Sequence, residues 1–112
     1  MKYMLLIYDN PANWEGVTEE QMQGLYAEYG AVSQNPATLS GSQLKPVETA
    51  KTVRITNGET LVTDGPFAET KEQLGGYYLV EAGSIEDAAK IGAAIPSARM
   101  GGSVEVRELV EM

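Results

Sequence analysis

The chain has 112 residues, with 16 acidic against 8 basic side chains, a net charge of -8, and neither cysteine nor histidine. This length accommodates a single domain, residues 1–112. The acidic charge opposes nucleic-acid phosphates and anionic lipid surfaces, so we expect no nucleic acid and no membrane as partners. The missing cysteine excludes disulfides and thiol catalysis, and the missing histidine removes the usual base near neutral pH.

Targeting and cofactor signals are absent as well. No apolar run approaches the roughly 18 residues of a membrane helix, and the start lacks the basic-then-apolar order of a signal peptide. We therefore expect a cytoplasmic protein. There is no phosphate-binding glycine loop, dinucleotide fingerprint or nucleophile elbow, so no cofactor is predicted.

Residues 2–8 are predicted to form a first strand that is apolar on both faces, which is typical of a central strand covered on both sides. Tyr3, Leu5 and Ile7 alternate with Met4, Leu6 and Tyr8. Asp9-Asn10-Pro11 ends the strand. Trp14 follows in a loop, where it is either a packing lid or a platform for a ligand.

A helix is predicted from Thr18, because Thr18 and Gln21 fit a capping box. Its apolar side chains recur every three or four residues and mark the face that packs on a sheet: Met22, Leu25, Tyr26, Tyr29 and Val32. Gly24 and Gly30 weaken the helix, and we expect them to allow close contact with the sheet. Asn35-Pro36 stops the helix, and residues 36–46 give no clear signal.

The second half predicts a hairpin, a strand, a helix and a last strand. Residues 49–56 and 59–63 flank Asn57-Gly58, which is a strong hairpin signal. Residues 75–82 form the next strand. Ser84 and Asp87 cap a second helix, whose buried side is Ala88, Ile91, Ala94 and Ile95 and which Pro96 closes. Residues 103–109 form a half-buried strand in which Glu105 and Arg107 share one face and are expected to form an ion pair at a subunit contact.

This order of elements fits an α+β fold, a ferredoxin-like sandwich with an antiparallel sheet. Two helices cover only one face of such a sheet, whereas the first strand is apolar on both. The second face therefore needs a partner, and we predict a homodimer with a pocket near its interface.

A polar loop, residues 64–72, links the hairpin to the strand at 75–82. Asp64-Gly65-Pro66 forms a stiff turn that presents the Asp64 carboxylate at a strand end. Phe67, the one phenylalanine of the chain, is predicted to anchor this loop in the core. Gly75-Gly76 then allows close backbone approach at the start of the strand.

Residues 64–81 resemble the signature of the DGPF family within the YciI-like (YCII-related) proteins. The resemblance extends to Met1–Tyr8 and to Gly102–Arg107. It implies a single YCII-related (DGPF) domain of the dimeric α/β-barrel type. Relatives carry a longer segment where this chain has residues 35–41, and many carry a histidine where it has Met100, so a histidine-assisted mechanism does not carry over.

Asp64 is the first candidate for chemistry. Burial could raise the pKa of its carboxyl towards neutrality and make it a general base, with Lys71 as charge partner. Glu69, Glu72 and Tyr78 are candidates for ligand binding. A hard-cation site from Asp64, Glu69 and Glu72 matches no known spacing, so no metal is predicted. The alternative is that Asp64 only caps its turn and its charged neighbours face solvent.

Two functions remain open at this point, and the sequence does not say whether the protein is an enzyme. In the first, a small organic molecule binds in a barrel pocket, with acid/base chemistry at Asp64. In the second, the protein is a non-catalytic binding or regulatory module. The family resemblance implies a link between such a module and sigma-factor-dependent transcription through protein contacts. An open polar pocket favours the first, and a pocket filled by its own side chains favours the second.

Overall fold

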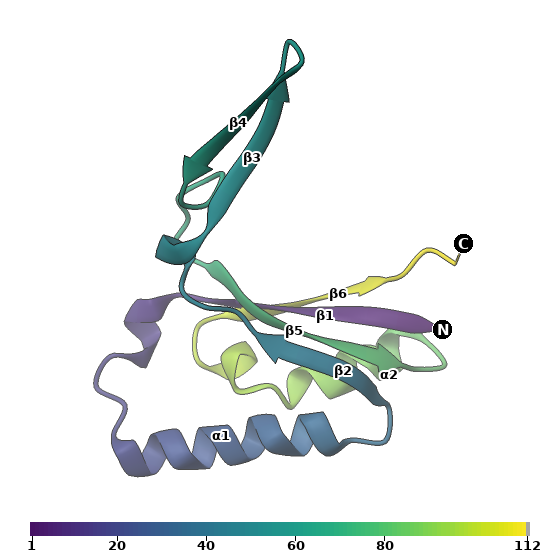
Figure 1. The fold of residues 1–112 in the computed structure, drawn as a ribbon. Coiled ribbons are helices and arrows are strands. Elements are labelled where there is room, and N and C mark those ends of the chain that lie inside the picture. The colour runs from purple at the N-terminus through teal and green to yellow at the C-terminus, as the bar shows by residue number, and fades with distance from the viewer. Residues whose placement is uncertain (112) are drawn as a thin grey trace.

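A computed structural model describes residues 1–111 as two helices packed against a four-stranded sheet, with a separate β-hairpin (Figure 1). The sheet contains β1 (Lys2–Asp9), β2 (Thr38–Gln43), β5 (Gln73–Glu81) and β6 (Ser103–Glu108). Its strand order is β2-β5-β1-β6, and every pair is antiparallel. This confirms the predicted α+β fold and its ferredoxin-like arrangement.

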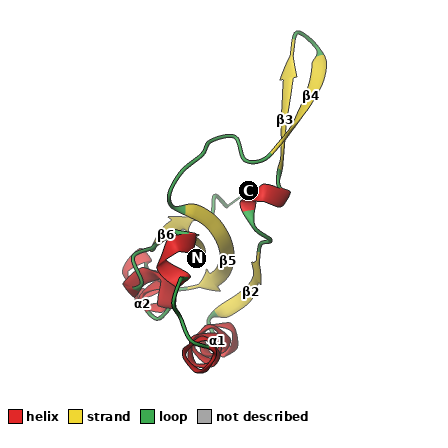
Figure 2. Ribbon diagram, turned by 90° about the vertical axis from the view of Figure 1, so that its left-hand side faces the viewer, coloured by secondary structure: helices red, strands yellow, loops and turns green. Residues whose placement is uncertain are grey.

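The helices α1 (Glu19–Gln34) and α2 (Ile85–Ala93) lie side by side on one face of this sheet (Figures 1 and 2). Three short 3-10 turns complete the chain: η1 (Pro11–Trp14), η2 (Val47–Thr49) and η3 (Pro96–Arg99). In the part of the chain that the structure describes, neither helix is long and apolar enough to cross a membrane.

The core lies between the sheet and the helices. The buried strand residues follow the predicted alternation, because β1 and β5 each turn every second side chain towards the helices. The core cluster consists of Tyr3, Leu5, Ile7, Val32, Tyr78, Val80, Ala88 and Ile95. Ala94, which we predicted on the buried side of α2, is exposed, because the helix ends at Ala93 and the chain turns there towards η3.

The opposite face of the sheet, which we call the free face, carries the other side chains of β1 and β5. In the strand register Met4 pairs with Leu79 and Leu6 pairs with Tyr77, so these four side chains share this face. All four are only partly buried, since both helices lie on the other side. The two-sided apolar pattern of β1 therefore leaves an apolar face without a covering layer in the described chain.

Local signals position α1 as predicted. The Thr18 hydroxyl accepts from the Gln21 amide at 3.1 Å, and the Gln21 side chain accepts from the Thr18 amide at 2.9 Å, which completes the capping box. The predicted close contact at Gly24 and Gly30 is wrong, because a Cβ atom at either position would meet no atom within 4 Å.

The hairpin of β3 (Lys51–Thr56) and β4 (Glu59–Asp64) is a sheet of its own. Its tip is Asn57-Gly58, with φ angles of 51° and 79°, as the sequence predicts for a two-residue turn. Both views show it projecting away from the helices, beyond the main sheet (Figures 1 and 2). It explains why the radius of gyration is 15.9 Å, whereas a compact chain of this length has about 13 Å. We call β3 and β4 the arm.

Three details around the arm differ from the sequence-based expectation. Residues 36–46 contain a regular strand, β2, which pairs with β5. Residues Val47–Thr49 form the turn η2, so the predicted strand begins at Lys51 rather than at residue 49. Phe67 does not anchor its loop in the core and is 81% exposed, because the loop follows the projecting arm and passes outside the sheet.

Two glycine substitutions test this packing. We expect Gly24→Ala to raise the free energy of unfolding by about 1 kcal/mol, because the site is open and alanine favours a helix interior. Gly102→Ala should lower it by about 1–3 kcal/mol through overpacking, because the new Cβ atom would lie 2.3 Å from the Tyr8 carbonyl oxygen and 3.0 Å from that of Ser97. Urea denaturation measures both. A neutral Gly102→Ala variant would contradict the close packing at this residue.

Candidate functional site

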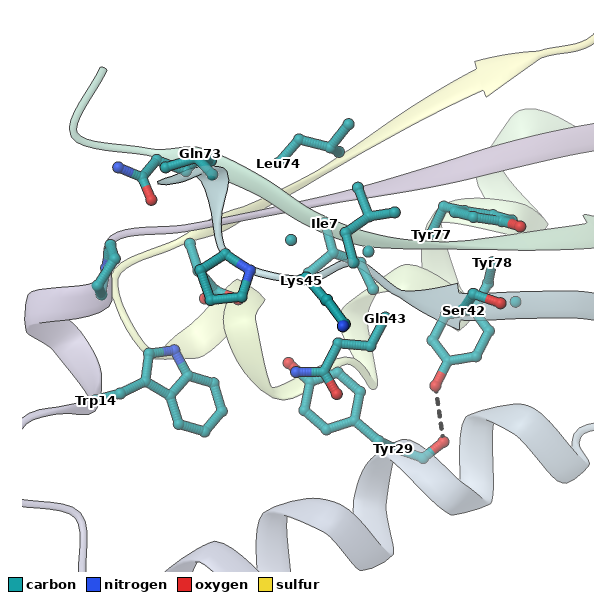
Figure 3. A pocket seen from close by; sticks show the side chains of 18 of the residues that line it. Ile7, Trp14, Tyr29, Ser42, Gln43, Lys45, Gln73, Leu74, Tyr77 and Tyr78 are labelled. Carbon is teal, nitrogen blue, oxygen red and sulfur yellow. Dashed lines mark hydrogen bonds between the residues drawn. The ribbon is translucent and has the colours of Figure 1, made fainter. Parts of the chain in front are cut away.

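A cavity of about 690 Å³ opens between α1, the end of β2, the segment 44–48 and the start of β5 (Figure 3). Trp14 stands at one end of the cavity in this view, Tyr78 stands at the other, and Gln43 and Lys45 lie between them. Residues from Ile7 to Tyr78 therefore contribute to one site.

The wall of the cavity is largely apolar and aromatic, with a few polar groups. Its aromatic and aliphatic side chains include Trp14, Met22, Tyr26, Tyr29 and Leu74. Its polar and charged side chains include Asp9, Ser42, Gln43, Lys45, Glu48 and Gln73. Within residues 1–111, Lys45 forms no ion pair. This composition is typical of sites for small organic molecules, in which a few polar groups orient a mostly apolar ligand.

A partly buried hydrogen-bond chain borders the cavity and joins three elements. The Tyr29 hydroxyl from α1 lies 2.7 Å from the Ser97 Oγ atom in η3. The same Ser97 hydroxyl donates to Oδ2 of Asp9, the last residue of β1, at 2.8 Å. Ser97 is fully buried. Asp9 and Tyr29 both line the cavity, so both ends of this hydrogen-bond chain are in contact with it.

The chemistry of these groups fixes which atom donates each hydrogen bond. An ionised carboxylate only accepts hydrogen bonds, so Ser97 must donate its single proton to Asp9. Its oxygen is then free to accept from Tyr29, which makes Tyr29 a donor. Burial raises the pKa of the Tyr29 phenol, and the Asp9 charge raises it further, whereas the hydrogen bond to Ser97 lowers it. Tyr29 therefore keeps its proton at neutral pH.

A second set of hydrogen bonds holds the Tyr29 backbone. The Tyr78 hydroxyl donates to the Tyr29 carbonyl oxygen at 3.0 Å, as the dashed line in Figure 3 marks. The Ser33 hydroxyl lies 3.2 Å from both that carbonyl oxygen and the Tyr78 hydroxyl oxygen. These contacts join α1 to β5 across the core and fix the helix turn from which Tyr29 extends.

Asp9 keeps one oxygen without a partner. Its Oδ1 atom is buried and has no hydrogen-bond partner among residues 1–111. Two glycines border the carboxylate: a Cβ atom on Gly102 would lie 3.0 Å from Oδ1, and one on Gly75 would lie 3.9 Å from Oδ2. The carboxylate is thus packed between β5 and the chain before β6, and it retains capacity to accept a hydrogen bond or a proton.

The residues predicted as a catalytic pair lie outside this cavity. Asp64 ends β4, its side chain is 86% exposed, and it pairs with Lys51 of β3 rather than with Lys71. Lys71 is exposed in the loop that returns to the sheet. The structure therefore does not bring Asp64 and Lys71 together, and the exposed Asp64 carboxyl lacks the burial that the general-base hypothesis requires.

The predicted ligand-binding residues are divided between the loop and the cavity. Glu69 and Glu72 are exposed, and Glu72 accepts from the Ser103 hydroxyl at 3.2 Å. Tyr78 lines the cavity. Tyr77 borders it as well, but neighbouring side chains leave a strand on opposite faces, so only the Tyr78 phenol extends towards α1. Within residues 1–111, Asp64, Glu69 and Glu72 do not form a cluster that could hold a metal ion.

Sequence reasoning missed Asp9 and Ser97. Asp9 looked like the residue that ends the first strand, and Ser97, which follows the predicted helix end at Pro96, was not singled out. A carboxylate directly after a two-sided apolar strand was a usable signal, because such a strand delivers its last residue to the edge of the core. Ser97 lies 88 residues further along the chain, and only the folded topology brings it to Asp9.

The whole chain is similar to known proteins. A family model described as the YCII-related domain matches residues 1–112. An uncharacterised protein of Rhizobium meliloti (strain 1021) is 34% identical over 114 residues, which cover 97% of this chain and 92% of that protein.

The Tyr29 phenol is expected to make stability fall at high pH. Because its pKa is higher in the folded protein than in the unfolded chain, its contribution to stability is complete below about pH 10 and is lost as the pH rises through the folded value. Tyr29→Phe should reduce this loss. Burial also raises the pKa of Tyr3, so part of the loss remains in the variant.

Urea denaturation between about pH 8 and pH 11 measures this effect. At neutral pH, Tyr29→Phe should lower the free energy of unfolding by about 1 kcal/mol through the lost hydrogen bond to Ser97. Tyr26→Phe on the exposed part of the same helix is the control for removal of a phenol hydroxyl. An unchanged pH profile in Tyr29→Phe would show that Tyr29 does not titrate as a buried phenol.

Proposed function

The chain belongs to the YCII-related family, and from that premise we propose that it binds a small organic molecule in the cavity beside Asp9. The observation that carries the proposal is the Asp9 carboxylate, which lines the cavity and is held in one orientation by Ser97. Each carboxylate oxygen has more than one acceptor site, so Asp9 can accept from a ligand as well as from Ser97.

The size and state of the cavity support this function. A volume of about 690 Å³ lies within the range of roughly 300–1,000 Å³ that is usual for small-molecule sites. The space is open rather than filled by the protein's own side chains. The openness favours small-molecule binding over a purely regulatory module, for which we expected a filled pocket, whereas the largely apolar wall differs from the polar one that we expected.

The lining points to a class of ligand. Trp14, Tyr26 and Tyr29 offer flat apolar surfaces, which suit an aromatic or similarly flat molecule. Asp9 suits a hydrogen-bond donor on the ligand, and Lys45 suits an acceptor or an anionic group. The proposed ligand is therefore a flat, mostly apolar molecule with a donor group and a separate acceptor or acidic group.

Asp9 also replaces Asp64 as the proposed proton acceptor. A carboxylate in the cavity can take a proton from a bound molecule and return it, which is the simplest acid/base step that these residues allow. The Ser97 hydroxyl, which donates to Oδ2, would hold the carboxylate in one orientation. Tyr29 remains protonated and can share its hydrogen bond between Ser97 and a ligand.

The free face of the sheet supports the homodimer that we expected from the sequence. Met4, Leu6, Tyr77 and Leu79 form an apolar surface with no covering layer among residues 1–111. Glu105 and Arg107 form an ion pair on the adjoining β6 strand, where Leu6 and Met4 are their register partners. Two such faces packed together would bury the apolar side chains in the manner of two sheets of a sandwich. The proposed assembly is a dimer built through this face.

A thermal-shift screen against a library of metabolites and aromatic compounds tests the binding function. A ligand at one hundred times its dissociation constant stabilises the native state by about 2.7 kcal/mol, which moves the melting temperature measurably. We expect a hit with the wild-type protein and a roughly 10–100-fold weaker affinity in Asp9→Asn, because a hydrogen bond to a charged acceptor is lost.

Asp64→Asn is the matched control, since it makes the same chemical change on the exposed arm. It should keep the affinity of the wild-type protein. A hit that depends on Asp64 and not on Asp9 would move the site back to the loop at 64–72. A library without any hit for the wild-type protein would count against small-molecule binding itself.

A further inference from the structure

The arm has one apolar face and one polar face. In the register of β3 and β4, Val53 pairs with Val62 and Ile55 pairs with Thr60, so Val53, Ile55 and Val62 share a face with Thr60. The Lys51–Asp64 ion pair lies on the same face at the base of the arm. The opposite face carries Thr52, Arg54, Thr56, Glu59, Leu61 and Thr63. Such alternation is typical of a sheet that buries one face and leaves the other in water.

In the chain by itself, this apolar face is open to solvent. Ile55 is 74% exposed, Val53 is 61% exposed and Val62 is 58% exposed. Exposed apolar side chains continue to the base of the arm, where Phe67, Leu44 and Leu74 lie. An isolated two-stranded hairpin is at best marginally stable in water. A well-formed arm with this pattern therefore needs a surface to pack against.

The position of the arm identifies that surface. The arm projects from the end of the sheet, on the side away from the helices, so that it borders the space above the free face (Figure 1). A second copy seated on the free face occupies that space. We propose that the apolar face of the arm, made by Val53, Ile55 and Val62, packs against a second copy of this chain and that this contact also shapes the cavity.

The charge of the arm fits a second copy as its partner. Lys51 and Arg54 balance Glu59 and Asp64, so residues 51–64 have no net charge and the whole formal charge of -8 lies outside them. An arm without net charge can approach an acidic copy without like-charge repulsion. The inference rests on the dimer proposed above, and it is independent of which ligand the cavity takes.

The link to the cavity lies in the two segments that hold the arm. The chain enters the arm from Leu44–Glu48, which lines the cavity, and η2. It returns through the loop at 65–72 to Gln73–Gly76, which also lines the cavity. The Gly65 amide donates to the Ala50 carbonyl oxygen at 2.7 Å and joins the two segments at the base. Fixing the arm therefore fixes both segments, and releasing it loosens one wall of the cavity.

A matched pair of variants tests the contact. Ile55→Lys places a charge on the apolar face, and Leu61→Lys makes the same change on the opposite face of the same hairpin. Sedimentation equilibrium should show a dimer for the wild-type protein and for Leu61→Lys. In Ile55→Lys the dissociation constant should rise roughly hundredfold or more, because a two-fold dimer loses the buried side chain twice.

Trp14 reports the effect on the cavity, since it is the one tryptophan of the chain and lines the site. Acrylamide, which quenches tryptophan fluorescence by collision, serves as the probe and needs no ligand. Quenching should be stronger in monomeric Ile55→Lys than in dimeric Leu61→Lys. Equal quenching in a dissociated Ile55→Lys protein would overturn the link between arm and cavity, while leaving the contact itself supported.

Hydrogen exchange tests the contact in the wild-type protein, so misfolding of a variant cannot affect the result. Backbone amides of β3 and β4 should exchange slowly at protein concentrations above the dimer dissociation constant and faster after dilution below it. The proposed contact is wrong if these amides exchange equally fast at both concentrations, or if Ile55→Lys remains as dimeric as Leu61→Lys. Ligand binding by the wild-type protein is measured separately. Sedimentation, quenching and hydrogen exchange can therefore be interpreted even if no ligand binds.

Discussion

The fold depends on β1, a central strand that is apolar on both faces and buries one of them beneath the helices. Its position between β5 and β6 gives it hydrogen-bonded neighbours on either side, and the two helices cover the face that carries Tyr3, Leu5 and Ile7. Apolar burial is the main force that holds such a domain together. The same strand ends at Asp9, so the element that organises the core also places a carboxylate beside the cavity.

Much of this arrangement could be predicted because its signals are local. Capping residues at Thr18 and Ser84, the Asn57-Gly58 turn and the alternation along β1 and β5 are chemical properties of short segments. Each gave the correct element within a few residues. The family resemblance then agreed with the order of elements. Only the segment 36–46 gave no local signal, and there β2 is specified by its pairing with β5 rather than by its own sequence.

The site was less predictable because it depends on how distant segments meet. The turn at Asp64-Gly65-Pro66 was read correctly as stiff, with Gly65 at φ 87°, but a stiff turn does not specify where it points. Here it lies at the base of a projecting arm, where the exposed carboxylate pairs with Lys51 across the hairpin. The prediction that Phe67 anchors its loop in the core is wrong for the same reason, because the sequence does not show where the loop lies. Asp9, Ser97 and Tyr29 come from three elements, and no spacing in the sequence connects them.

The hydrogen-bond chain from Tyr29 through Ser97 to Asp9 is difficult to explain as a structural device alone. Burying Ser97 and an oxygen of Asp9 costs free energy, and a hydrogen bond returns only about 1 kcal/mol. If these hydrogen bonds served stability alone, every buried polar atom among them would be expected to have a partner. Oδ1 of Asp9 has none in the described residues. An apolar replacement of similar volume would avoid this cost. The structure places this cost at the wall of an open cavity, where the carboxylate that Ser97 holds would meet the ligand proposed above.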